Sequence, residues 1–142
     1  MQKTLAESCN YKILDEYETV YLLFKNTGKI VIIGDFYGDP ETAFISNNES
    51  YCVVGGCGLI IYYLKEPFYE FEYNNKCKQW KEVFRNLNDV WWIEDISERS
   101  DSKIVKFTVD SDDGIRDGIY EIDVFTLNIR RFGANHKGRG IK

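Results

Sequence analysis

Short apolar segments separated by turn-forming residues dominate the pattern of this chain. Most of these segments are rich in β-branched and aromatic residues, which is typical of strands. In 103–110, Val105, Phe107 and Val109 alternate with polar positions, so the segment has one apolar face. The pattern predicts strands at residues 19–24, 29–34, 42–46, 50–54, 59–64, 90–96, 103–110, 118–125 and 127–132.

The connections between these segments are short and polar. Asn26-Thr27-Gly28 joins the first two segments, and Asn47-Asn48-Glu49 joins the next two. Connections of this length allow hairpins but not crossover helices. We therefore expect mainly antiparallel pairing.

A different spacing follows Tyr73. Cys77, Trp80, Phe84 and Leu87 recur every three or four residues, which predicts a helix at about 75–87. The expected fold class is α+β, a mostly antiparallel sheet of seven to nine short strands with this one helix. No segment of 20–50 residues recurs, so the sequence predicts neither a solenoid nor a propeller.

The size of the chain indicates a single domain. It has 142 residues, of which 44% are hydrophobic and 29% charged, a globular composition. We expect one domain at 1–132 and a basic, mobile tail at 133–142. The N-terminus lacks a secretory signal, and the longest apolar run, 59–64, is far shorter than the roughly 20 residues of a membrane helix. The expected location is cytoplasmic, without membrane contact.

The net charge of −5 conceals an asymmetry. Residues 130–142 contain five bases and no acid, so residues 1–129 contain 13 bases and 23 acids. Such an acidic body repels phosphates and argues against nucleic-acid binding. It favours a basic protein partner that is steered by charge.

Acidic residues cluster beside aromatic ones, a combination that suits a surface for a basic protein because rings anchor and charges steer. The predicted partner-binding residues are Tyr69, Glu70, Glu72, Trp91, Glu94, Asp95, Glu98, Asp110, Asp112, Asp113 and Asp117. A solvated strand face beside core aromatics is the alternative interpretation of each cluster.

Catalytic and metal motifs are weak. The only histidine, His136, lies in the predicted tail. The acidic loop 110–117 misses the EF-hand pattern by one residue, because glycine stands fifth and isoleucine sixth. The four cysteines, which form no C-x-x-C pair, are expected to be structural thiols: Cys9, Cys52, Cys57 and Cys77. We expect no catalytic residues, no metal and no small-molecule cofactor.

Two other functions remain open. A small hydrolase would use Asp35, Asp39 or Cys57 around a deep pocket. A non-enzymatic adaptor or sugar-binding β module would expose Trp91 or Trp92 beside a groove. Since these tryptophans are adjacent, a strand would point them to opposite faces, and at most one would join a given core.

The run IVIIGDFYGDPETAFISNNESYCVVGGCGLIIYYL, residues 30–64, resembles bacterial immunity proteins encoded beside polymorphic toxins, including those of contact-dependent growth inhibition. The resemblance implies a non-enzymatic protein that binds the C-terminal domain of one cognate toxin, often a nuclease, and blocks it. It transfers no binding residue by position. The leading hypothesis is therefore an immunity protein that neutralises a basic toxin domain by tight 1:1 binding.

Overall fold

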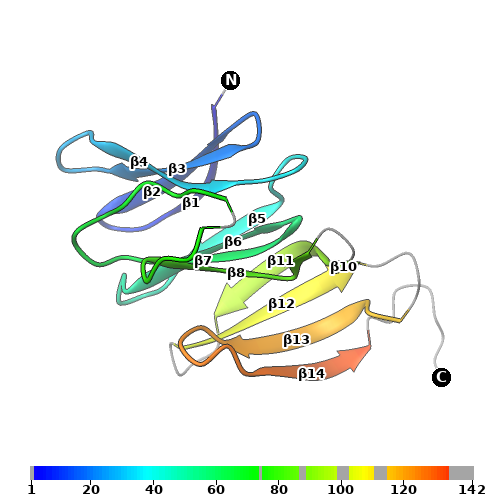
Figure 1. The fold of residues 1–142 in the computed structure, drawn as a ribbon. Coiled ribbons are helices and arrows are strands. Elements are labelled where there is room, and N and C mark those ends of the chain that lie inside the picture. The colour runs from blue at the N-terminus through cyan, green and yellow to red at the C-terminus, as the bar shows by residue number, and fades with distance from the viewer. Residues whose placement is uncertain (1, 74, 87–88, 99–102, 111–114, 135–142) are drawn as a thin grey trace.

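The computed structural model describes residues 2–73, 75–86, 89–98, 103–110 and 115–134. The described residues form fourteen strands and no helix. Twelve of these strands form three four-stranded antiparallel sheets. Each sheet is an up-and-down meander in chain order, and the second sheet lies between the first and the third (Figure 1).

The bounds of the strands follow chain order. The first sheet contains β1 (Gln2–Glu7), β2 (Tyr11–Glu16), β3 (Thr19–Phe24) and β4 (Ile30–Asp35). The second contains β5 (Thr42–Ile45), β6 (Tyr51–Gly56), β7 (Gly58–Tyr63) and β8 (Trp80–Val83). The third contains β11 (Trp92–Glu98), β12 (Ile104–Asp110), β13 (Gly118–Asp123) and β14 (Ile129–Ala134). Between the second and third sheets, β9 (Arg85–Asn86) pairs with β10 (Asp89–Val90).

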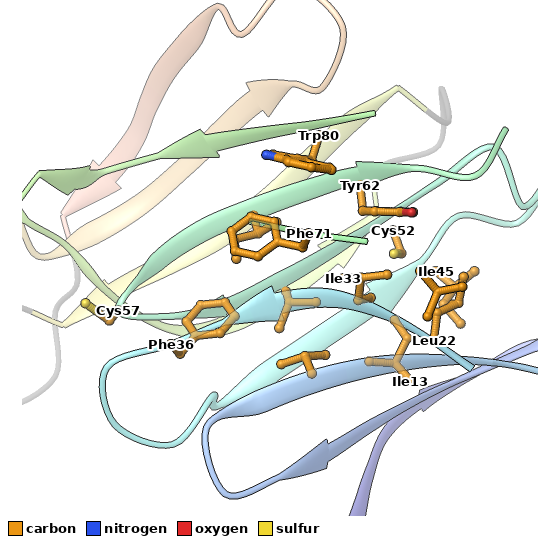
Figure 2. Packing of buried hydrophobic residues seen from close by; sticks show 14 residues of the cluster. Ile13, Leu22, Ile33, Phe36, Ile45, Cys52, Cys57, Tyr62, Phe71 and Trp80 are labelled. Atoms are coloured by element: carbon orange, nitrogen blue, oxygen red, sulfur yellow. The ribbon is translucent and has the colours of Figure 1, made fainter. Parts of the chain in front are cut away.

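The middle sheet is buried on both faces. One face packs Cys52 and Ile60 against Ile13, Leu22 and Ile33 of the first sheet, which forms the first core (Figure 2). All six residues of β6 are buried, as are five of the six in β7. Because both faces meet a core, these strands are apolar runs without a polar alternation.

The second core lies on the opposite face of the middle sheet. There Tyr51 and Leu59 contact Phe107 and Ile122 of the third sheet. Side chains of β12 that face this core alternate with more exposed ones, as predicted. The sequence therefore encodes one doubly buried sheet between two sheets that are each buried on one face.

The predicted helix at 75–87 is wrong, and with it the α+β class. The described part of this segment contains β8 and β9, and the domain is all-β in the described residues. Phe84, between the two strands, has a φ of 62°, a left-handed conformation that interrupts the extended backbone.

The spacing of large side chains in this segment has a different cause. Trp80 pairs with Tyr62 and packs in the first core, whereas Val83 pairs with Leu59 and packs against the second. Three residues apart in a strand means opposite faces. Because β8 belongs to the doubly buried sheet, both faces demand apolar residues, and the result imitates a helical period.

The other predicted strands are present, with shifts of at most two residues at their ends. The predicted hairpins of β3 with β4 and of β5 with β6 are confirmed. The sequence analysis did not anticipate β1 and β2. Strand β14 extends to Ala134, while residues 135–142, including His136, lie outside the described residues.

The three meanders repeat in structure although the sequence shows no repeat. The first strand of the second sheet, β5, contacts the first strands of the other two sheets, β1 and β11. Four-stranded sheets that stack about their first strands resemble successive blades of a propeller, an architecture that the sequence did not indicate.

No helix in the described segments is long and apolar enough to cross a membrane.

Candidate functional site

Several connections meet at one end of the stacked sheets and enclose a pocket of about 530 Å³. They are the β2–β3 turn, the segment after β4, the β6–β7 turn and the region between β7 and β11. Four aromatic rings contribute to this pocket, which we call the aromatic pocket. Its lining residues are Glu18, Asp35, Phe36, Tyr37, Cys57, Tyr73, Arg85, Val90 and Trp92. Figure 2 shows Phe36 and Cys57 together at one end of the first core.

Arg85 holds the wall of the aromatic pocket together. Its side chain is only 7% exposed, and its Nε donates to Glu82 Oε1 at 2.9 Å. Its Nη1 donates to the Cys57 carbonyl at 2.9 Å and its Nη2 to the Asp35 carbonyl at 2.6 Å. The guanidinium also lies over the Phe36 ring, 4.7 Å from its centroid. This arginine therefore ties β4, the β6–β7 turn and β9 into one wall.

A glycine-rich turn positions the strand that carries Trp92. Gly56 pairs with Gly58 across the one-residue turn at Cys57. Gly58 has a φ of 83°, and a Cβ there would lie 2.1 Å from Arg85 Cγ and 2.8 Å from the Phe84 carbonyl oxygen. Its amide donates to the Trp91 carbonyl at 2.8 Å. Only glycine fits this turn, which gives a structural reason for the Gly-Gly-Cys-Gly sequence.

The two adjacent tryptophans have different environments, as alternation predicted. Trp91 stacks on Phe84, with centroids 4.2 Å apart and an interplanar angle of 7°, and packs against the second core. Trp92 is 47% exposed and lines the aromatic pocket. The exposed ring at this site is therefore Trp92, whereas the predicted partner-binding residue Trp91 lies mainly inside.

Trp92 also lines a second hollow, of about 410 Å³. Glu41, Glu94 and Asp110 line this acidic hollow together with Trp92 and Ile93. Trp92 pairs with Asp110 across the β11–β12 ladder. The structure thus brings two predicted partner-binding acids, Glu94 and Asp110, together with an exposed tryptophan.

The two hollows have a negative balance. Among the described residues, the aromatic pocket is lined by the carboxylates of Glu18 and Asp35 and by one cation, Arg85, which is already paired with Glu82. Within the described residues no hydrogen bond or ion pair engages the side chains of Glu18 and Asp35. Exposed carboxylates beside uncovered rings attract cations rather than anions.

Three predicted residues lie elsewhere, on the long connection between β7 and β8. Glu70 Oε1 accepts a hydrogen bond from the Ile32 amide at 3.1 Å, and Glu72 Oε1 accepts one from Asn75 Nδ2 at 2.7 Å. Tyr69 is 55% exposed. Since Glu70 attaches this connection to the edge of β4, it has a structural role.

The remaining predicted residues do not form a common surface. Asp95 is exposed on β11, and Glu98 ends that strand. Asp117 is only 7% exposed, and its carbonyl accepts a hydrogen bond from Arg131 at 2.6 Å. Asp112 and Asp113 lie outside the described residues.

The residues considered for a hydrolase are partly brought together. Asp35 and Cys57 both line the aromatic pocket, whereas the exposed Asp39 does not line it. Burial strongly raises the pKa of the Cys52 thiol, which makes that cysteine unreactive. In the part of the chain that the structure describes, no group of three His, Cys, Asp or Glu side chains could hold a metal ion.

The sequence analysis did not identify most of the aromatic pocket. Tyr37 is 81% exposed in the loop after β4, where an aromatic residue surrounded by Gly, Asp and Pro cannot join a strand face. That context could have marked it as a surface ring. Arg85 lies within the predicted helix at 75–87, which the structure replaces with strands, so the sequence pattern did not indicate its role in the pocket wall. Glu18 and Tyr73 carry no distinctive pattern.

Comparison with known proteins adds no family to this description. A scan against protein-family models and a search of curated proteins both gave no match to the sequence. The function is therefore argued from the two hollows around Trp92.

Proposed function

We propose that the protein is an immunity protein that binds a basic toxin domain through the end of the sheets that carries Trp92. The observation that supports this proposal is an exposed tryptophan between two acid-lined hollows. Aromatic anchors surrounded by charged groups are the usual composition of tight protein interfaces. The overall net charge of −5 suits a basic partner.

The charge of the site suggests how neutralisation would work. A nuclease toxin binds phosphates with Lys and Arg, and the acids at the hollows would occupy those groups. Glu18, Asp35, Glu41, Glu94 and Asp110 supply the acids. No step of this mechanism needs catalysis by the immunity protein.

The experiment begins with the toxin domain encoded beside this gene. We expect 1:1 binding of nanomolar or tighter affinity, with an association rate that falls about tenfold or more between low salt and roughly 0.5 M salt. Trp92→Ala is expected to weaken binding by about 30-fold, the effect of a hot-spot residue. Tyr69→Ala is the matched control, because Tyr69 is also an exposed aromatic but lies away from both hollows.

Three results would contradict the proposal. Absence of binding and protection against every adjacent toxin domain would remove it. Equal effects of Trp92→Ala and Tyr69→Ala would move the interface elsewhere. An association rate that does not depend on salt would remove the electrostatic part.

A sugar-binding module is the second candidate, and the same exposed Trp92 beside a hollow favours it. A sugar ring would stack on the indole, and its hydroxyl groups would donate hydrogen bonds to the carboxylates of Asp35 or Glu18. Saturable binding of an oligosaccharide that Trp92→Ala abolishes, without binding of any toxin domain, would select this function.

A further inference from the structure

The aromatic pocket has the chemistry of a site for a cation that arrives on an alkyl stem. Its walls are Phe36, Tyr37, Tyr73 and Trp92, and two carboxylates lie beside them. A volume of about 530 Å³ accommodates a large side chain. We propose that this pocket takes the side chain of one arginine of the partner; this rests on the proposed function and names what the site binds.

The rings that remain uncovered are the ones an incoming guanidinium would use. Arg85 already lies over Phe36 and, at 5.6 Å from the centroid, over Tyr73. Trp92 and Tyr37 are 47% and 81% exposed and make no ring contact within the described residues. Tryptophan is the strongest aromatic partner for a cation.

The local charge selects a cation over an anion. Arg85 already donates through its Nε, Nη1 and Nη2 to Glu82 and to two backbone carbonyls, which leaves fewer of its N–H groups for an anion. The carboxylates of Glu18 and Asp35 line the pocket together with this guanidinium, and Glu82 already pairs with it. An added positive charge therefore offsets the negative charge of the pocket, whereas a phosphate or carboxylate adds to it.

Arginine fits this pocket better than lysine does. Its planar group stacks on aromatic faces and is weakly hydrated, so it enters an apolar pocket at lower cost than an ammonium group. The same group can donate two parallel hydrogen bonds to a carboxylate such as that of Asp35. Arg85 provides an example in the wall of the same pocket, because it stacks on Phe36 and is almost fully buried.

The test uses the free protein with N-acetyl-arginine amide, followed by NMR of the three tryptophan indole N–H groups. We expect a saturable shift of the Trp92 signal with a Kd of about 1–10 mM, as suits a ligand of this size. The citrulline and lysine derivatives should bind at least about fivefold more weakly. The variant Trp92→Phe assigns the signal.

Matched variants locate the ligand. Asp35→Asn should weaken binding of N-acetyl-arginine amide several-fold, whereas Glu94→Gln, which removes a carboxylate from the acidic hollow only, should leave it unchanged. Equal binding of the arginine and citrulline derivatives would overturn the inference. So would equal effects of these two variants.

The two proposals can fail separately. Toxin binding without any binding of the arginine derivative would reject the arginine pocket and leave the immunity function standing. Binding of the arginine derivative without toxin binding would support the pocket and reject the immunity function.

Discussion

Removal of the Arg85 guanidinium should destabilise the protein more than removal of any surface charge. In Arg85→Met the Glu82 carboxylate, 16% exposed, loses its ion pair with Arg85, and two carbonyls lose hydrogen bonds from a charged group. Breaking a largely buried ion pair costs about 3–5 kcal/mol. The open side of the pocket admits water to the carbonyls, so we expect a total loss of about 3–5 kcal/mol in the free energy of unfolding.

Urea unfolding followed by tryptophan fluorescence measures this loss. A loss of this size is a large fraction of the roughly 5–15 kcal/mol that stabilises a domain. Lys25→Met is the control for a surface ion pair: the side chains of Lys25 and Glu7 are 34% and 47% exposed, so the loss should stay below about 1 kcal/mol. Arg85→Lys keeps the charge without the planar fork and should fall between the two.

A double-mutant cycle separates the ion pair from the rest. If Glu82 and Arg85 stabilise each other, Arg85→Met combined with Glu82→Met should cost less than the sum of the single variants by at least about 1 kcal/mol. Additive effects, or an Arg85→Met variant as stable as Lys25→Met, would refute the structural role of this arginine.

Three further variants probe the backbone and two carboxylates. Gly58→Ala should reduce the free energy of unfolding by about 1–3 kcal/mol more than Gly28→Ala, because both glycines have φ near 80° but only the first Cβ meets other atoms; equal losses in urea unfolding would contradict this. Burial raises the pKa of Asp15, so its ionised form opposes folding above its folded pKa, and this penalty is relieved as the pH falls through that pKa. Asp15→Asn should be at least as stable as wild type at pH 7, with a difference in the free energy of unfolding that shrinks in acid. A less stable variant would exclude the penalty. Although burial acts against it, hydrogen bonds from the β1–β2 turn lower the pKa of Glu49. Its contribution to stability is therefore complete above pH 4.5 and is lost as the pH falls through the lowered pKa. Glu49→Gln should cost about 1–2 kcal/mol of stability at pH 7 and flatten that acid dependence, whereas an unchanged acid dependence would contradict this role of Glu49.

The strands that face one core could be predicted, because alternation has a single cause there. Val105, Phe107 and Val109 are buried as the pattern indicates, with less buried positions between them. The failure at β8 has the same physics with an added condition. A strand of a sheet that is buried on both sides has no polar face, so Trp80 and Val83 could serve two cores at once. The number of sheet layers cannot be derived from the sequence pattern. Without it, the apolar spacing in this segment fits a doubly buried strand as well as a helix.

The candidate site could be predicted only at the adjacent tryptophans, where the geometry of a strand was sufficient. Adjacent tryptophans cannot both enter one core from a strand, so either Trp91 or Trp92 had to face away from it, and Trp92 does. The partners of Trp92 come from connections far apart in the sequence, at Glu18, Tyr37 and Arg85, and no spacing links them. Their proximity follows from the stacking of three meanders, whose turns on one side meet at the same end. An acidic cluster in sequence is therefore a poor guide to the site in this fold, since the acids that meet at Trp92 belong to different sheets.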